Sequence, residues 1–385
     1  MKLVASAMVA SAAPSTLANI GAALVGVGLI AYAALGGADF GAGLWDLLAR
    51  GPRAARQRDA IMHALGPVWE ANNVWLIYVI VVTWTAFPVV YAAVSTALFI
   101  PIVLALVGIV LRGAGFGLRS QFAERAGIAT AWGYTFNGAS VIAPFMLGAL
   151  AGAIAGGDIR VIGGVVQANL WTTWTVPFAL VCGAFAVAIC ATLAAAYLAV
   201  EARMAGDAEL TNDFRVRALW AGAVTAVLGA AAALLSRAEE PLLWSGLVGK
   251  ALPLSLGAML IGLLAAVALL RGRYLWARYL VAGEIACILA AWAVAQYPYL
   301  IIPDVTIASA AAPDSVLLAV TIASAAGALV LFPSLWYLFA IFKGRPRPAR
   351  AVTAASLAEQ GLRAAFAPSA EPRDSGQTPQ QGARP

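Results

Sequence analysis

Nine long runs of apolar residues constrain this chain more than any other feature of its sequence. Each run is close to the roughly 20 residues that an α-helix needs to cross the hydrocarbon core of a bilayer. Charged residues make up only 11% of the chain, whereas an ordinary soluble domain carries about 25%. The pattern predicts an all-α integral membrane protein with nine transmembrane helices, and it excludes a soluble enzyme or a nucleic-acid-binding protein. The predicted spans are residues 20–48, 74–91, 94–111, 128–155, 171–200, 218–235, 252–270, 279–297 and 316–342.

The Lys and Arg residues predict how these spans are oriented. Of the 24 Lys and Arg residues, all but four fall in loops and a tail that nine spans place on one side of the membrane. Cytoplasmic loops are enriched in Lys and Arg, so we expect the N-terminus outside and the C-terminus in the cytoplasm. Arg112 and Arg119, near the end of the third span, are interpreted first as such anchors and second as partners for a buried acid. The four exceptions are Lys2, Arg160, Arg237 and Lys250.

Two segments fall outside the predicted nine-helix domain of residues 19–343. Residues 1–18 form an N-terminal extension, whose first 13 residues carry one Lys and small residues, as a short signal peptide does. An unstructured outer extension fits them equally well. Residues 344–385 are rich in Pro, Gln, Ala and Arg, a composition typical of a disordered tail, and the charge pattern places them in the cytoplasm. Within the domain, only a very short turn near Pro88 and Tyr91 separates the second and third spans, which predicts an antiparallel hairpin.

Side chains that bind metals are too few to predict a metal centre within this chain. Haem, copper and non-haem iron sites usually draw on several His, Cys or Met ligands, and the chain has a single histidine, His63. A lone His beside an arginine-rich loop is usually solvated or paired locally, although haem ligation is the alternative. The cysteines lie inside apolar runs, so they are interpreted as small core residues without a disulfide. They are Cys182, Cys190 and Cys287.

Three acids, Asp39, Glu70 and Glu284, lie outside the loops and the tail, at positions where an ionisable side chain is costly and needs a reason. Asp39 lies in the first span between Gly37 and Gly41, whose spacing lets another helix approach closely. Its carboxylate should point into the bundle, where it either relays protons or forms a structural contact that pins two helices. Asp46 follows near the end of the same span. Glu284 lies about two turns inside the eighth span, and the sequence identifies no partner for it.

The third acid, Glu70, belongs to a polar mouth at the cytoplasmic end of the second span. Its run reads Gly-Pro-Val-Trp-Glu-Ala-Asn-Asn-Val-Trp-Leu over residues 66–76. Glu70 and Asn73 are three residues apart and share a helix face, while Trp69 and Trp75 can anchor the helix at the membrane surface. The carboxylate either admits protons from the cytoplasm or stabilises the helix N-terminus, where negative charge is favourable.

These polar runs resemble the motifs of a known family. Gly-Ala-Asp-Phe-Gly at residues 37–41 resembles its Gly-Phe-Asp-x-Gly motif, and residues 66–76 resemble its Gly-Pro-x-Trp-Asp/Glu-x-Asn-x-x-Trp-Leu motif. Phe-Pro at 87–88, Arg-Gly at 112–113 and Tyr-Pro-Tyr-Leu at 297–300 follow at matching positions. By this resemblance, which covers about residues 20–344, the chain is identified as a member of subunit II of the cytochrome bd-type quinol oxidases.

The resemblance implies a terminal oxidase of the bacterial cytoplasmic (inner) membrane, which oxidises quinol and reduces dioxygen to water in aerobic respiration. Its partner, subunit I, carries the b and d haems and the quinol site. Subunit II in this family ligates no haem and holds no catalytic residue, and some members bind a structural quinone in it. Members take protons from the cytoplasm and are built from two four-helix bundles plus one peripheral helix.

Carried over by position, two acids become candidates for proton transfer. Asp39 matches the second acid of the first-span motif, and Glu70 matches an acid that the family links to proton delivery. This sequence has fewer acids than other members of the family at two positions, because Gly36 and Gly117 stand where those members have acids. The resemblance therefore implies that this chain stabilises the haem-bearing subunit and helps deliver protons to it. The supporting positions are Trp69, Asn72, Asn73, Trp75 and Arg112.

Two other functions remain open on the sequence. A proton-coupled secondary transporter would also place acids and broken helices in the membrane. A purely structural membrane subunit would use its acids only to pin helices. An oxidase subunit should purify with a coloured, haem-bearing partner, whereas a transporter would purify alone and bind a solute.

Overall fold

Long α-helices account for most of the residues that the computed structural model describes, which are 13–65, 69–122 and 125–343. The described residues up to Phe339 form one compact unit. The predicted signal-like segment and most of the predicted tail lie outside the described residues. After the first span, the longer helices are α4 (Ala54–Leu65), α5 (Trp69–Ala86), α6 (Pro88–Ala97), α7 (Phe99–Gln121), α8 (Ala126–Ala155), α10 (Pro177–Met204), α11 (Ala208–Glu239), α12 (Pro241–Val248), α13 (Leu252–Leu270), α14 (Tyr274–Gln296) and α16 (Asp314–Lys343).

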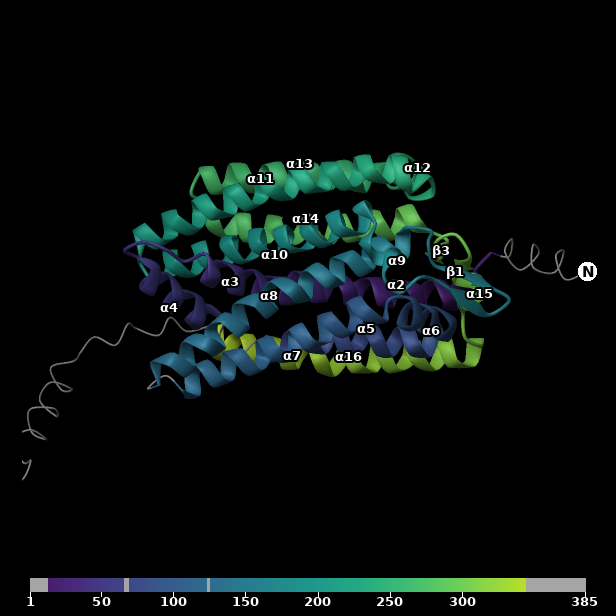
Figure 1. Cartoon of the computed structure of the whole chain (residues 1–385), viewed down its shortest axis with the longest axis horizontal. Coiled ribbons are helices and arrows are strands. Elements are labelled where there is room, and N and C mark those ends of the chain that lie inside the picture. The colour runs from purple at the N-terminus through teal and green to yellow at the C-terminus, as the bar shows by residue number, and fades with distance from the viewer. Residues whose placement is uncertain (1–12, 66–68, 123–124, 344–385) are drawn as a thin grey trace, which may run out of the picture. The chain divides into compact units, whose positions relative to one another are not determined.

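The number of helices that can cross a membrane agrees with the prediction. Within the described ranges, eight helices are long and apolar enough to span a bilayer, and α5 with α6 makes nine if that bent pair is one span. Figure 1 shows the long helices running side by side, with α4 at one end of them and α12, α15 and the strands at the other. The prediction of a mostly helical membrane fold is therefore confirmed.

The first span is one continuous helical segment with a change of register in its middle. It runs from Thr16 to Leu47 and consists of α2 (Thr16–Ala31), the π-helical turn η1 (Tyr32–Gly36) and α3 (Gly37–Leu47). A π turn inserts one residue into an α-helix, which changes the faces that the following side chains occupy. The residues of α3 therefore face directions that a straight 3.6-residue repeat would not predict.

The second predicted span is wrong in its C-terminal part. Helix α5 ends at Ala86, and α6 begins at Pro88 after a bend of 117°. Proline disfavours the helical conformation of the residue before it and cannot donate a backbone hydrogen bond. Phe87 accordingly leaves the helical region, with φ −137° and ψ 63°. The predicted very short turn before the third span is instead the ten-residue helix α6.

Two small antiparallel hairpins lie between spans, where the prediction had only loops. Strands β1 (Arg160–Ile162) and β2 (Val165–Gln167) form the first, and β3 (Tyr299–Ile301) and β4 (Val305–Thr306) form the second. Arg160 donates to Asp304 in the loop between β3 and β4, with an Nε–Oδ2 distance of 2.7 Å. The short helices α9 (Thr172–Thr175) and α15 (Ile307–Ala310) lie in the same connections.

Helix α10 lies at the centre of the bundle and packs against α3, α8, α11 and α14. Its C-terminal half is rich in buried alanine, and small side chains let helix backbones come close together in a membrane. Gly41 of α3 lies against the backbone carbonyl of Cys190, where a Cβ atom would overlap α10. Gly37 lies against the side chain of Leu193. The predicted close approach at Gly37 and Gly41 is confirmed.

Charged groups hold α4 to the start of α11, outside the apolar part of the bundle. Arg53 makes two hydrogen bonds to Asp213, at 2.9 and 2.8 Å. Gln57, which is buried, donates to the same carboxylate and accepts from Arg217 at 2.7 Å. Many of the arginines that predict the cytoplasmic side therefore also build structure, since several of their guanidinium groups bind acids from another helix.

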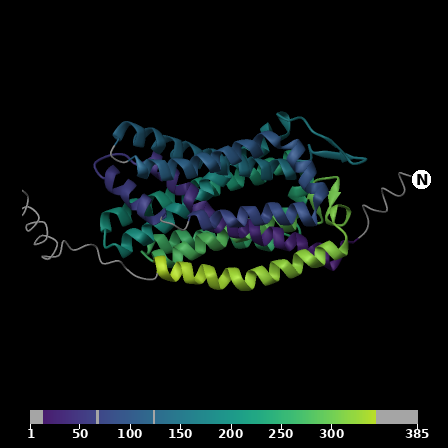
Figure 2. The ribbon, with the colours of Figure 1, turned by 90° about the horizontal axis from the view of Figure 1, so that it is seen from below.

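Helix α16 lies along one edge of the bundle, as Figure 2 shows in yellow-green. Only 6% of the most apolar stretch of α16 is buried inside the protein, whereas 56% of the corresponding stretch of α10 is buried. A helix this apolar and this exposed needs lipid or another protein around it. It is the least buried of the membrane spans in the part of the chain that the structure describes.

Glu240 is a buried acid at the joint between α11 and α12, outside the membrane spans. Its side chain lies beside Gly156 and Gly157, and the residue is 7% exposed. Burial, together with the charges of Asp158 and Glu239, raises the pKa of Glu240 from 4.5 to about 7. Because the folded protein holds this proton more tightly than the unfolded chain does, Glu240 makes stability depend on pH.

Replacing Glu240 with Gln is expected to protect the protein at alkaline pH. The stability that depends on protonated Glu240 is complete below about pH 4.5 and is lost as the pH rises through about 7. E240Q should therefore melt about 2–4 °C higher than the natural chain at pH 8, and the gap should narrow at pH 5. Thermal melts of the purified complex measure this, with the exposed Asp59 changed to Asn as the control. The same pH dependence in E240Q and the natural chain would show that another group is responsible.

Candidate functional site

The π-helical turn η1 sets the position of Asp39. Asp39 lies in the first turn of α3, directly after η1. Single π turns within α-helices occur frequently at functional sites. Here the turn places the carboxylate toward α5 and leaves the backbone carbonyl of Leu35 available to a side chain from that helix, as the contacts of Asn72 show.

Asn72 of α5 binds both of these groups. Its Nδ2 donates to Asp39 Oδ2 at 2.7 Å and to the carbonyl oxygen of Leu35 at 3.1 Å. Asn72 is buried, so both hydrogen bonds are made away from bulk water. A hydrogen bond to an ionised group is about twice as strong as a neutral one. Asn72 therefore fixes the orientation of the Asp39 carboxylate and joins the first span to α5.

Arg112 brings a buried positive charge to the same place from α7. It is 3% exposed, and its guanidinium carbon lies 5.0 Å from the ring centroid of Phe40 and 5.6 Å from that of Phe136. A cation over an aromatic ring gains about 0.5–2 kcal/mol. The charge of Asp39 attracts Arg112 as well. Asp39 is half-buried, and with the buried Asn72 and Arg112 it forms one polar cluster built from three helices, the buried polar cluster.

A second acid, Asp46, lies two turns further along α3. It is 2% exposed, and its Oδ2 accepts from Arg119 Nη1 at 2.8 Å. Arg58 Nε lies 3.9 Å from the other carboxylate oxygen. Two arginines therefore compensate the charge of Asp46, and the pair with Arg119 is partly shielded from water.

The two acids and the two arginines have the same spacing on their helices. Asp39 and Asp46 are seven residues apart on α3, and Arg112 and Arg119 are seven residues apart on α7. Seven residues are nearly two helical turns, or about 10.5 Å along the axis. Two acid–arginine contacts are therefore stacked along neighbouring parts of α3 and α7. The distance between them is too long for one hydrogen bond, so a proton moving from one acid to the other would need intermediate groups or water.

Of the other residues predicted for the site, the structure places Trp75 beside this cluster. Trp75 is buried and packs with Tyr32 and Phe40 beside it. Asn73 is half-buried, and the described hydrogen bonds of the cluster use Asn72 in its place. Residues 69 and 70 begin α5, but the side chains of Trp69 and Glu70 lie outside what the structure describes.

Glu284 lies apart from the buried polar cluster. Its carboxylate lies against Gly262 of α13, where the glycine leaves room for it. Arg278, the nearest arginine in sequence, lies instead 3.9 Å from Glu201 and over the ring of Tyr197. His63 is exposed on α4.

The described side chains do not assemble a metal site. Within residues 13–65, 69–122 and 125–343, no three His, Cys, Asp or Glu side chains lie where they could share a metal ion. The cysteines are free thiols, with Cys190 buried and Cys182 and Cys287 half-buried. The described carboxylates of Asp39 and Asp46 instead accept hydrogen bonds from Asn72 and Arg119.

Asp46 and Arg119 are the functional candidates that the sequence reasoning missed as a pair. The equal seven-residue spacing of the acids on α3 and of the arginines on α7 was a usable signal. It would have required knowing that the arginine side chains of α7 reach α3 and that the two helices run in the same direction.

The comparison with known families decides between the functions left open. The family model for cytochrome bd terminal oxidase subunit II matches residues 17–342. The chain belongs to this family. It is therefore a subunit of a cytochrome bd quinol oxidase, an oxidoreductase complex of the bacterial inner membrane. This membership confirms the predicted terminal oxidase subunit over a transporter.

Individual relatives agree with the family assignment. The chain is 24% identical to a candidate cytochrome bd menaquinol oxidase subunit II of Bacillus subtilis over 337 residues, which cover 85% of this chain and 96% of that one. It is 29% identical to the cytochrome bd-I ubiquinol oxidase subunit 2 of Escherichia coli over 211 residues, 53% of each chain. A chain in the structure of the bd oxidase from Geobacillus thermodenitrificans has the same fold, with a TM-score of 0.69 and 22% identity over 85% of this chain and 99% of that one.

Proposed function

We propose that this subunit II stabilises a haem-bearing subunit I and contributes acids that carry cytoplasmic protons toward the oxygen site of that partner. The observation that carries the proposal is the buried polar cluster, where an acid is held in place by an amide and an arginine in the interior of the membrane domain. Ionisable groups inside a membrane are expensive and usually serve a pathway for ions or protons.

The proposal follows from the chemistry of the reaction. Reduction of dioxygen to water consumes protons, and quinol supplies the electrons. An acid can take up a proton from one side and release it on the other if its neighbours do not trap one protonation state. In the cluster, Arg112 and Asp39 attract each other by their charges, while Asn72 keeps the carboxylate in one orientation. Glu70, in the first turn of α5 two residues before Asn72, is the second acid of the proposed relay.

The proposed orientation puts the N-terminus outside and the C-terminus in the cytoplasm. It is supported by the excess of Lys and Arg in one set of loops. In this orientation Asp46, Arg119 and Arg58 lie toward the cytoplasm from Asp39, on the side from which protons would enter. The arrangement as two four-helix bundles plus one peripheral helix belongs to the same proposal, and the exposure of α16 supports α16 as the peripheral helix.

The cofactors of the complex are placed in the partner by this proposal. Haems b and d belong to subunit I in this proposal, which is supported by membership of the cytochrome bd subunit II family. The proposed substrate is a quinol, because one relative is named as a menaquinol oxidase subunit and another as a ubiquinol oxidase subunit. A structural quinone inside this chain would survive detergent washing of the purified complex and appear in its organic extract.

Replacing the two relay acids should slow the oxidase without removing its haems. We expect Asp39→Asn and Glu70→Gln each to lower quinol-driven oxygen uptake several-fold, because an amide cannot pass on a proton as an acid does. The haem content, read from the absorption spectrum, should stay normal. Glu284→Gln is the matched control, since it removes a membrane acid that lies outside the cluster. Full oxygen uptake by both variants at full haem content would refute the relay and leave only the stabilising role.

A further inference from the structure

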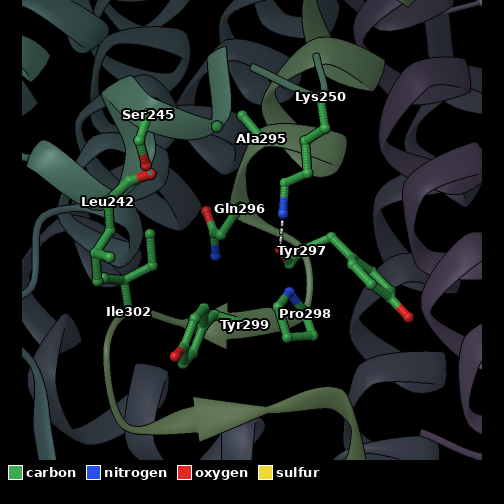
Figure 3. A pocket seen from close by; sticks show the side chains of 10 residues that line it. Leu242, Ser245, Lys250, Ala295, Gln296, Tyr297, Pro298, Tyr299 and Ile302 are labelled. Carbon is green, nitrogen blue, oxygen red and sulfur yellow. Dashed lines mark hydrogen bonds between the residues drawn. The ribbon is translucent and has the colours of Figure 1, made fainter. Parts of the chain in front are cut away.

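A pocket of about 360 Å³ lies where α12 meets the end of α14, far in sequence from the buried polar cluster. Figure 3 shows the side chains that face it. They combine apolar surface with a few polar groups that the oxidase function does not use. The side chains that matter here are Leu242, Ser245, Lys250, Gln296, Tyr299 and Ile302.

The pocket is built by a close approach of two helices. Gly246 of α12 lies against the backbone carbonyl of Ala295 in α14, and a Cβ atom at this glycine would overlap that carbonyl. Helix α14 then ends at Gln296, and the chain turns into β3. Gln296 Nε2 donates to the carbonyl oxygen of Leu300 at 2.9 Å, which ties the side chain to this turn.

Gln296 presents a hydrogen-bond acceptor that its own chain does not use. The residue is 5% exposed, and its Oε1 has no hydrogen-bond partner among the described residues. Because the Leu300 carbonyl can only accept a hydrogen bond, the group that faces it is the Gln296 amide nitrogen, and the other end of the amide is the oxygen. In Figure 3 the oxygen points to the side of Leu242 and Ser245, and the nitrogen points the other way. A buried acceptor left without a donor costs about 1–3 kcal/mol, so a ligand that donates a hydrogen bond there would be favoured.

Lys250 also lines the pocket and supplies a cation to it. Its Nζ donates to the carbonyl oxygen of Tyr297. An ammonium group has three donors, so two remain for a ligand. Lys250 is exposed, and it lies in the short connection between α12 and α13. An anionic group in the pocket would therefore meet the ammonium while its remaining oxygens stay in water.

The level of the pocket in the membrane identifies the kind of ligand. The span of α13 begins at Leu252, and the span of α14 ends at Gln296. The polar groups of the pocket therefore lie at the edge of the hydrocarbon layer, the depth at which lipid headgroups lie. Leu242 and Ile302 add apolar surface beside them.

We propose that this pocket binds a phospholipid whose headgroup carries a hydrogen-bond donor. The phosphate contacts the Lys250 ammonium, the ammonium or hydroxyl of the headgroup donates to Gln296 Oε1, and an acyl chain lies on Leu242 and Ile302. The acceptor at Gln296 makes the site selective. Phosphatidylethanolamine and phosphatidylglycerol can donate to it, whereas the methylated ammonium of phosphatidylcholine cannot.

Lipid selectivity of the purified oxidase complex tests the proposal. The delipidated complex is titrated with phosphatidylethanolamine and with phosphatidylcholine of the same acyl chains, and bound lipid is counted by native mass spectrometry. We expect the natural complex to prefer phosphatidylethanolamine about ten-fold, the ratio that corresponds to one hydrogen bond of about 1.4 kcal/mol. Equal binding of the two lipids by the natural complex would by itself overturn the proposal.

Variants then assign the preference to the two residues. Gln296→Leu should abolish the preference while leaving binding of phosphatidylcholine unchanged, and Gln296→Met serves if the first variant does not assemble. Lys250→Gln should weaken both lipids several-fold at an unchanged ratio. The control is Arg237→Gln, which removes an exposed cation from the end of α11 outside the pocket. A preference that persists in both Gln296 variants, or an equal loss in Arg237→Gln and Lys250→Gln, would contradict the assignment.

A competition experiment distinguishes a site for a lipid from a site for a soluble phosphate ester. Glycerophosphoethanolamine has the same headgroup without acyl chains. It should not displace the bound lipid at millimolar concentration, because it lacks the contacts with Leu242 and Ile302. Displacement by this compound would show that the pocket binds soluble phosphate esters, and the proposed lipid site would be wrong.

Discussion

Arg119→Leu is expected to lower the melting temperature of the purified oxidase by about 6–10 °C. The substitution leaves Asp46, which is 2% exposed, with only the more distant Arg58 to compensate its charge. Removing one partner of a buried ion pair costs about 3–5 kcal/mol, and 1 kcal/mol shifts the melting temperature of a large domain by about 2–4 °C. Multiplying these two figures gives the expected shift in melting temperature, and we take the low end of that range because Arg58 remains near Asp46. Differential scanning fluorimetry of the complex measures it.

A double variant separates a charge effect from a packing effect. Asp46→Leu with Arg119→Leu should recover most of the lost stability, because an apolar pair in the place of a buried ion pair is often neutral or stabilising. Arg125→Leu, which removes an exposed arginine just after α7, is the control and should change the melting temperature little. A double variant no more stable than Arg119→Leu would show that the loss does not come from an uncompensated acid.

Gly41→Leu is expected to prevent assembly of the haem-containing complex, and Gly41→Ala to destabilise it by about 1–3 kcal/mol. A Cβ atom at residue 41 would overlap the backbone of α10 at Cys190 and crowd the side chain of Ala194. A backbone cannot move aside as the end of a flexible side chain can, so α3 and α10 would have to separate. The yield of haem per membrane protein and the melting temperature report the two effects.

The controls for Gly41 are glycines in the same environment with free space around them. Gly26 lies in the same span and Gly257 lies in α13, and no atom lies within 4 Å of a Cβ built at either. Alanine at these positions should be neutral or stabilise the helix by up to about 1 kcal/mol, because glycine is the poorer helix former. If Gly41→Ala were as stable as Gly26→Ala, the contact between α3 and α10 would not limit the packing of the bundle.

The helical spans could be predicted from the sequence because each depends on a short stretch of chain. The apolar run at 252–270 became α13 with the same bounds, since the requirement for some 20 apolar residues is set by the bilayer and not by the rest of the protein. The predicted second span failed at Phe87, although Pro88 was visible, because hydropathy alone does not say whether a proline kinks a helix or ends it. The bend of 117° between α5 and α6 depends on what surrounds it.

The candidate site was predicted in its members but not in its contacts. Asp39, Asn72 and Arg112 were singled out, and the structure brings them together. The sequence analysis named both Asn72 and Asn73, and the structure shows Asn72 bound to Asp39. Which of two adjacent amides faces the first span depends on the rotation of α5 about its axis, and that rotation is set by contacts along the whole helix.

By itself, the sequence determined that this is a membrane protein, for which it predicted nine helical spans with acids inside them, and that its motifs are those of a cytochrome bd oxidase subunit II. These features are local, because they follow from apolar run lengths and from short motifs. Only the tertiary structure decided that Arg119 pairs with Asp46, that Gly41 lies against α10, and that Lys250 and Gln296 share a pocket. Such pairings join residues from different helices. They depend on helix rotation and close approach, which many weak contacts determine together.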